Sequence, residues 1–338
     1  MSEDHRIPER TADELWDDAI VIDGLNVSNW DAEEVYRCLG ESGVTAINAT
    51  SAVWENCSQA LDNIAAWYAR AHEPSAGIMI AKSVDDIRAA KQCGKVGIIL
   101  GWQNATPIEN DLRRLEVFQR LGVRIIQLTY NERNLLGNGC YERHDDGLSR
   151  FGVDAVREMN RLGILIDLSH VGDVTTLEAA RLSTQPVAAT HANARAMFDH
   201  VRNKSDEALR MIAQKGGVVG ANAFPLFFPK RFTATLSDYV DAVEDLIERI
   251  GVDHVAIGTD YTQCQSRSFF EWLFAQQGTK PQQEPLGYPE PLLHPTGMET
   301  PDKLRNVAAE LFKRGYGTEE IRKVVGGNWL GLFERVWE

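Results

Sequence analysis

Two histidines and one aspartate are the residues of this sequence best suited to chemistry. His170 ends the segment IDLSH, His191 ends VAATH 21 residues later, and Asp260 ends VAIGTD. Imidazole and carboxylate groups are ligands for zinc-like ions. The 21-residue spacing equals one strand-plus-helix unit, so neighbouring strands would bring the two rings close enough to share an ion. The alternative is that each histidine is simply a hydrogen-bonded residue at a strand end.

Other reactive side chains give weaker signals. Arg202 lies in HVRNKSDEAL, before a helix cap, where its guanidinium could hold a substrate carboxylate in a bidentate pair; a solvated loop arginine is the alternative. Cys140, in GCYERHDDG, could be a ligand or nucleophile, but an unreactive loop thiol is the simpler interpretation. The pair Asp145 and Asp146 is most simply a solvated turn. We assign no role to the remaining histidines, which resemble surface or loop residues: His5, His72, His144, His200, His254 and His294.

A recurring unit indicates the elements that must position these residues. An amphipathic stretch ends in glycine, and a β-branched run follows almost at once, as at Gly122, Gly163 and Gly251. Glycine commonly ends helices because it accepts the left-handed conformation. Two sets of apolar residues each fall on one helical face: Leu112, Leu115, Phe118 and Leu121, and Val240, Val243, Ile247 and Ile250.

Counting all copies of the unit gives eight strands, which alternate with helices. They are predicted at 20–25, 44–49, 96–101, 124–129, 164–169, 186–190, 217–222 and 254–259. This α/β pattern predicts a closed (β/α)8 TIM barrel that occupies residues 1–338 as a single domain. A doubly wound open sheet is the alternative, although no GxGxxG follows the first strand.

Three segments extend the simple repeat. Residues 50–95 are expected to add a pair of helices, and residues from Asp302 to Trp337 form C-terminal helices that close the domain. Residues 261–300 form a long loop rich in proline and glutamine after the last strand. That loop is either a lid, a subunit contact or a surface loop without a role.

The predicted strands place polar residues at one mouth of the barrel, where active sites of this architecture form. The residues at or just past the strand ends are Leu25, Asn26, Asn48, Gln103, Asn104, Tyr130, Asn131, His170, His191, Asn222 and Asp260.

Composition excludes several partners. The chain has 338 residues and a formal net charge of −14, which repels nucleic acid and anionic membrane surfaces. The polar first twenty residues do not resemble a secretory signal, and no apolar run approaches the roughly 20 residues of a spanning helix. Five scattered cysteines favour free thiols in a reducing compartment. We therefore expect a cytoplasmic protein whose partner is a small molecule; a homodimer is compatible with this, because such barrels often pair.

Several motifs together resemble the membrane (renal) dipeptidase family of the amidohydrolase superfamily. They are FGVDAVREMNRLGILIDLSHVGDVTTLEAA, PVAATHANARAM, RNKSDEALRMIAQKGGVVGAN and VAIGTDYTQ, in the family's order, and the similarity runs from VIDG at 21–24 to GGNWL at 326–330. The resemblance implies a barrel that holds two zinc ions and hydrolyses dipeptides, including those ending in D-residues, and some related amides.

The resemblance also assigns roles to individual residues. His170 and His191 match the pair that binds the second zinc, and Arg202 matches the arginine that holds the dipeptide carboxylate. Asp260 matches the acid that contacts the first metal and shuttles a proton.

This sequence departs from the family at four positions. The family's first-strand histidine and aspartate are replaced by Leu25 and Val27. Gln103 stands where a bridging glutamate is expected, and Tyr130 replaces the histidine that assists at the substrate carbonyl. Hydrocarbon side chains cannot bind zinc, and a neutral amide does not offset the repulsion of two close dications.

Two hypotheses follow. In the first, His170 and His191 hold at most one zinc or similar ion, with Gln103, Asp260 or water completing its ligands. Asp260 and Tyr130 are then catalytic, and Arg202, Tyr130 and Asn222 bind a dipeptide or related small amide with a free carboxylate. In the second, the barrel holds no metal and binds or acts on a small carboxylated ligand through a hydrogen-bonded pocket.

Overall fold

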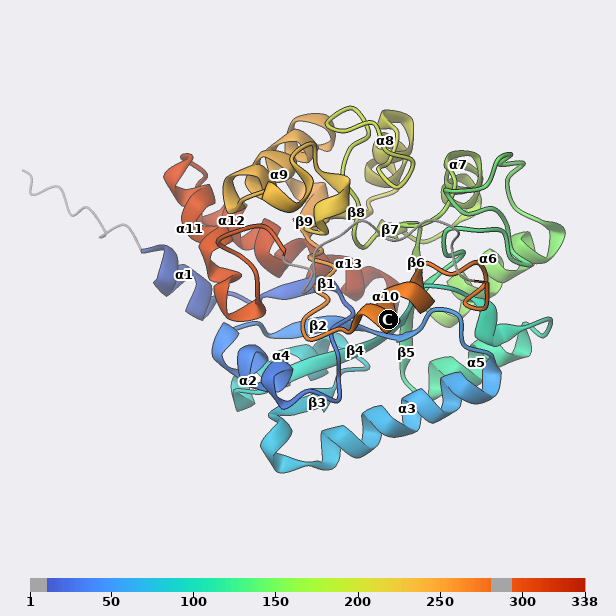
Figure 1. The fold of residues 1–338 in the computed structure, drawn as a ribbon, viewed down its shortest axis with the longest axis horizontal. Coiled ribbons are helices and arrows are strands. Elements are labelled where there is room, and N and C mark those ends of the chain that lie inside the picture. Colours follow the sequence, from blue (N-terminus) through green and yellow to red (C-terminus); the bar gives the residue numbers. More distant parts are fainter. Residues whose placement is uncertain (1–10, 281–293, 338) are drawn as a thin grey trace, which may run out of the picture.

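The fold is a barrel of parallel strands surrounded by helices. The computed structural model describes residues 11–280 and 294–337, and within them one parallel sheet follows the order β1-β2-β4-β5-β6-β7-β8-β9 (Figure 1). Backbone hydrogen bonds join its first and last strands, from Asp260 N to Leu25 O (3.0 Å) and from Val27 N to Tyr261 O (2.8 Å). The predicted (β/α)8 barrel is confirmed, and the open doubly wound sheet is wrong.

Each predicted strand overlaps an observed one. The bounds are β1 Ile22–Asn26, β2 Ala46–Ala52, β3 Ile78–Ile80, β4 Val96–Trp102, β5 Val123–Gln127, β6 Leu165–Asp167, β7 Ala188–Ala189, β8 Val218–Ala221 and β9 Val255–Ile257. The sequence did not predict β3, which pairs with β4 outside the barrel path. Three residues are too few to show a period, and β3 lies inside the segment 50–95, which otherwise supplies α3 and α4.

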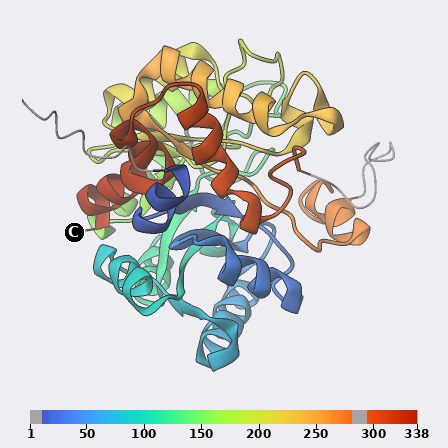
Figure 2. The ribbon, with the colours of Figure 1, turned by 90° about the vertical axis from the view of Figure 1, so that its left-hand side faces the viewer.

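Helices cover the outside of the barrel (Figures 1 and 2). The longer ones are α1 Ala12–Asp18, α2 Glu33–Ser42, α3 Cys57–His72, α4 Val84–Cys93, α5 Arg113–Arg120, α6 Arg150–Leu162, α7 Asp173–Leu182, α8 Asp206–Gln214, α9 Leu236–Ile250, α10 Arg267–Leu273, α11 Arg305–Lys313, α12 Thr318–Arg322 and α13 Asn328–Trp337. Gly163 ends α6 with a φ of 63°, and Gly251 ends α9 with a φ of 85°, as predicted for these helix stops.

The C-terminal helix α13 fills the end of the barrel opposite the predicted mouth. Trp329, Leu332 and Phe333 pack against residues near the starts of the strands, such as Ile22 and Val218. The Trp329 indole also donates to the Ile257 carbonyl at 2.8 Å. This apolar plug leaves the carboxyl ends of the strands as the open end.

Glycines let the strands approach closely just below that mouth. A Cβ atom at Gly24, Gly220 or Gly258 would lie 2.6, 2.1 or 2.0 Å from the Thr190 carbonyl oxygen. Real Cβ atoms do not come so close to an oxygen. Strands β1, β8 and β9 can therefore surround the end of β7 only because these three positions are glycine. The residue that follows Thr190 is His191.

Two of the polar residues singled out from the sequence are more buried than predicted. Asp145 is not a solvated turn residue, because its carboxylate accepts hydrogen bonds from the Val174 and Thr175 amides (2.7 and 3.1 Å) at the start of α7. His294 is also buried, and its Nε2 accepts from the Thr262 amide at 3.1 Å. His5 and the stretch 281–293 of the predicted long loop lie outside the described residues; the described part of that loop contains α10.

None of the helices within residues 11–280 and 294–337 combines the length and apolar character needed to cross a bilayer.

Closure of the barrel also depends on a buried acid that the sequence analysis did not single out. Asp23, on β1, accepts hydrogen bonds from the Thr259 amide (2.8 Å) and hydroxyl (2.6 Å) beyond β9. Burial raises the pKa of this carboxyl to about 7 and outweighs the hydrogen bonds from Thr259, which lower it.

We predict that Asp23 makes the protein less stable as the pH rises from about 4 to about 7. The folded state binds this proton more tightly than the unfolded chain, so the free energy of unfolding contributed by Asp23 falls across that interval. Urea denaturation of the wild type and of Asp23→Asn, at about pH 5.5 and about pH 8, measures it. The stability advantage of the wild type should shrink at the higher pH; an advantage that grows would contradict the assignment.

Candidate functional site

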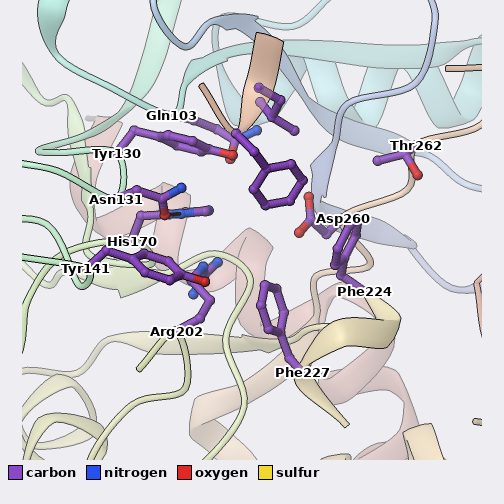
Figure 3. Close-up of a pocket in the computed structure, with 12 residues that line it drawn as sticks. Gln103, Tyr130, Asn131, Tyr141, His170, Arg202, Phe224, Phe227, Asp260 and Thr262 are labelled. Carbon is purple, nitrogen blue, oxygen red and sulfur yellow. Dashed lines mark hydrogen bonds between the residues drawn. The ribbon is translucent and has the colours of Figure 1, made fainter. Parts of the chain in front are cut away.

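A small cavity lies at the carboxyl ends of the strands. It is lined by Gln103, Tyr130, Asn131, Tyr141, His170, Arg202, Phe224, Phe227, Asp260, Thr262, Leu273 and Phe274, and it encloses about 20 Å³. In Figure 3, Tyr130, Asn131 and His170 form one wall, and Asp260 with Phe224 lies on the facing wall. The cavity therefore brings together five of the predicted site residues, Gln103, Tyr130, His170, Arg202 and Asp260.

The two histidines meet as predicted. His170 follows β6 and His191 follows β7, and their Nε2 atoms lie 3.0 Å apart. Both rings are buried. Two nitrogens bound to one tetrahedral zinc ion would be about 3.3 Å apart, given Zn–N distances of about 2.0–2.1 Å.

Hydrogen bonds fix which nitrogen of each ring carries the proton. The Thr190 hydroxyl has one proton, which it donates to the Asp167 carboxylate at 2.6 Å. The Thr190 oxygen must therefore accept from His191 Nδ1, 2.7 Å away. Asn131 Oδ1 likewise accepts from His170 Nδ1 at 2.7 Å. Both Nε2 atoms then present lone pairs to each other, the state in which imidazole binds a metal.

Burial, aided by nearby cations, keeps the rings neutral. Burial, and secondarily the charges of Arg202 and Lys204, hold the pKa of both His170 and His191 well below the usual value. Lys204 is itself buried, and its ammonium donates to the Val171 carbonyl at 2.6 Å. Burial lowers the pKa of Lys204 to about 8. Doubly protonated rings are thus disfavoured, and a shared cation would relieve the repulsion between the Nε2 lone pairs of the two neutral rings.

Arg202 is a fixed residue of the barrel mouth, and the solvated-loop alternative is wrong. Its side chain is only 1% exposed. Its guanidinium donates to the carbonyl oxygens of Ser169 (2.8 Å) and His191 (2.7 Å). No acidic side chain within residues 11–280 and 294–337 forms an ion pair with it, and its buried Nε has no hydrogen-bond partner there. A buried cation without a direct ion pair is costly; Asp260 in the same cavity offsets part of that cost, and an anionic ligand would offset more of it.

Asp260 faces the same cavity from beyond β9. Its backbone has a left-handed φ of 58°, a conformation that aspartate tolerates better than most residues. Burial raises the pKa of Asp260 to about 6, against the opposing charge of Arg202. Asn222 donates to its carboxylate at 3.3 Å and to the His191 carbonyl at 3.3 Å. Asn222 is completely buried and outside the cavity lining, so its placement favours bracing these groups over the predicted substrate contact.

Tyr130 stacks on the His170 ring, with the centroids 4.2 Å apart. Burial holds the pKa of its phenol well above the usual value, so the hydroxyl stays protonated and can only donate or accept hydrogen bonds. Gln103 donates its amide to the Thr50 hydroxyl at 3.0 Å, which leaves its side-chain oxygen for other partners.

The first strand contributes only hydrocarbon near the site. Leu25 and Val27 are buried, at 2% and 4% exposure. In the described part of the chain, no group of three or more histidine, cysteine, aspartate or glutamate side chains is placed to hold a metal ion. The residues therefore fit one ion on the histidine pair, with neutral or water ligands completing it, but they do not fit a second ion beside β1.

Several lining residues were not assigned a role from the sequence. Asn131, which orients His170, was visible only as a polar residue past a strand end. Tyr141 and Phe224 come from loops and Phe227 ends a single 3-10 turn, where no periodic pattern marks them. Cys140 donates its backbone amide to the His170 carbonyl at 2.9 Å, and burial raises the pKa of its thiol, which disfavours a nucleophilic role.

A family model for membrane dipeptidases (peptidase family M19) matches residues 10–271. The chain belongs to this family. The family is one of hydrolases, and the resemblance noted from the sequence motifs is confirmed.

The curated relatives are longer than this chain. Dipeptidase tcpJ of Claviceps purpurea (strain 20.1) is 31% identical over 260 residues, which cover 76% of this chain and 55% of the relative. An uncharacterized dipeptidase, C965.12, of Schizosaccharomyces pombe is 30% identical over 261 residues, 75% of this chain and 55% of the relative. The chain thus spans little more than half the length of these relatives.

Solved structures match over nearly the whole chain. An amidohydrolase from Pseudomonas aeruginosa is 41% identical, with a TM-score of 0.93, and the match covers 97% of this chain and 99% of that one. A metallopeptidase from Rhodobacter sphaeroides, solved with a phosphinate mimic of the dipeptide L-Ala-D-Ala, shares the fold with a TM-score of 0.76 at 23% identity, over 95% of this chain and 100% of that one.

We predict that Thr190→Val weakens zinc binding by about 10- to 100-fold, because His191 loses the acceptor that fixes its proton on Nδ1. Isothermal titration with zinc measures the affinity. Thr175→Val is the matched control, since it removes another buried bond from threonine to aspartate, to Asp145, without contacting either histidine or Asp260. Equal losses in both variants would show that general destabilisation, and not ring orientation, is responsible.

Proposed function

We propose that this M19 protein is a single-metal hydrolase of small amides that carry a free carboxylate, such as dipeptides or N-substituted amino acids. One observation carries the proposal: two imidazole lone pairs 3.0 Å apart adjoin a cavity with a buried arginine that lacks an acidic partner among the described residues. The pair suits one divalent cation, and the arginine suits one carboxylate. We propose zinc, held by His170 and His191, as the resident ion.

A bound zinc ion would supply Lewis-acid polarisation of a water molecule or of the amide carbonyl. The chain's own groups would do the rest. Arg202, fixed by two carbonyl oxygens, would orient the substrate carboxylate. Asp260, with a pKa raised to about 6 by burial, would be mostly ionised at neutral pH and could accept a proton. Tyr130, which stays protonated, would donate a hydrogen bond to the substrate.

The cavity is too small for a substrate in the form described. A volume of about 20 Å³ admits little more than one water molecule. Leu273 and Phe274, at the end of α10, form part of its wall. Binding of a dipeptide would therefore require α10 and its neighbours to move, and the closed form would exclude water from the reaction.

One observation favours a second candidate function, a barrel without metal that binds a carboxylated ligand. The 3.0 Å separation of the two Nε2 atoms is also a hydrogen-bond distance, which one ring would span if, in the absence of metal, it carried a second proton on Nε2 besides the one on Nδ1. In that case the histidines, Tyr130 and Asp260 would act as a hydrogen-bonded pocket.

Metal content separates the two functions. We expect protein purified with added zinc to contain about one ion per chain by elemental analysis, and His170→Ala to contain almost none. Absence of zinc from the wild type would favour the metal-free pocket. Two ions per chain would contradict our interpretation of Leu25, Val27 and Gln103.

Replacing the Arg202 guanidinium tests whether the substrate carries a free carboxylate. We predict that Arg202→Lys lowers kcat/KM for N-acyl amino acids, N-alkyl amino acids or dipeptides by about 100-fold, because a bidentate contact becomes a single one. The same substrates with the carboxylate converted to a carboxamide provide the control, since they lack the charge that Arg202 recognises. A similar loss on both substrate series would show that Arg202 acts through the structure of the mouth instead.

A further inference from the structure

A second, larger cavity of about 270 Å³ lies at the same end of the barrel. Its lining comes from the loop after β1, the end of β2, α3 and α10. On and beside α10, Phe269 and Trp272 face this cavity, whereas Leu273 and Phe274 face the His170 cavity. The two cavities have no lining residue in common among the described residues, so a ligand in the larger one need not touch the proposed hydrolytic groups.

Aromatic rings form much of its wall. Trp30 and Trp67 lie with their centroids 4.9 Å apart and their planes tilted by 57°, and Phe269 and Trp272 add two rings from α10. The Arg70 guanidinium already sits 5.6 Å over the Trp67 ring. Ring faces attract cations through their quadrupole, most strongly in tryptophan, so these walls suit a positively charged group.

The charged groups of the lining leave a negative excess. The Arg70 guanidinium is paired with the Asp31 carboxylate at 2.6 Å. The Glu55 carboxylate is held only by neutral donors, the Val53 amide (2.6 Å) and the Asn63 side chain (3.1 Å). No lysine or arginine within residues 11–280 and 294–337 forms an ion pair with Glu55. Its charge is therefore fixed in position and not neutralised.

We propose that this cavity binds a small organic cation, a primary or methylated ammonium group on an apolar body. Glu55 would offset the charge, and Trp30, Trp272 and Phe269 would surround the ammonium and its carbon substituents. An anionic ligand is disfavoured, because the one arginine of the lining is already paired and Glu55 would repel it. The cavity is smaller than typical drug-binding sites, which are about 300–1,000 Å³. Its ligand must therefore be smaller than a typical drug.

Choline and its neutral carbon isostere provide the test, since they have the same shape and differ in charge. Isothermal titration of the full chain should show saturable binding of choline and about tenfold weaker binding of the isostere. Glu55→Gln should weaken choline binding by about tenfold and leave the isostere unchanged. Asp62→Asn is the matched control, because it removes an equal charge from an exposed position on α3 outside the cavity lining.

Two further variants locate the site and guard against misfolding. Trp272→Leu, at a half-buried position on α10, should weaken choline binding even if Glu55→Gln proves unstable. His170→Ala should bind choline as the wild type does, which separates this site from the proposed hydrolysis. Absence of saturable choline binding, equal affinity for the isostere, or loss of binding in His170→Ala would each overturn the proposal.

Discussion

The hydrogen bond from Thr190 to Asp167 is the constraint on which the candidate site depends. Strands β6 and β7 are short and pair through a single backbone register, Asp167 with Ala188. The Asp167 carboxylate strengthens that junction by accepting from the Thr190 amide (3.0 Å) and from the hydroxyls of Thr190 and Ser169 (both 2.6 Å). Because the Asp167 carboxylate accepts the only hydroxyl proton of Thr190, it also determines which ring nitrogen of His191 carries the proton. One buried carboxylate thus both joins β6 to β7 and sets which nitrogen of His191 is free to bind a metal.

The same device recurs where the barrel closes. Asp23 of β1 holds Thr259 as Asp167 holds Thr190, and in each case the next residue, Asp260 or His191, belongs to the candidate site. Burying a carboxylate is costly unless it is hydrogen-bonded. Asp23 and Asp167 accordingly each accept several hydrogen bonds. The two bonds place reactive side chains around an interior in which glycines let the strands come close to the Thr190 carbonyl.

Charge balance distinguishes this site from one built for two dications. The mouth holds two buried cationic residues, Arg202 and Lys204, and no cluster of three potential acidic or imidazole ligands among the described residues. The charges of Arg202 and Lys204 favour neutral histidines and disfavour a second dication. On the far side of α10 the signs are reversed, since Glu55 is unneutralised in an aromatic cavity. The helix therefore lies between two cavities with different charged linings at one end of the barrel.

Sequence by itself determined the barrel, its strands, the glycine stops at Gly163 and Gly251, and the meeting of His170 and His191, because periodicity and strand-end position are local and each unit repeats the same geometry. It also marked Leu25 and Val27 as hydrocarbon. Only the tertiary structure decided that Arg202 is buried without an acid, that Asn222 braces Asp260, and that Asn131 and Thr190 set the histidine tautomers. Those properties arise from contacts between residues far apart in the chain, and burial and hydrogen-bond partners exist only once the strands have closed around them.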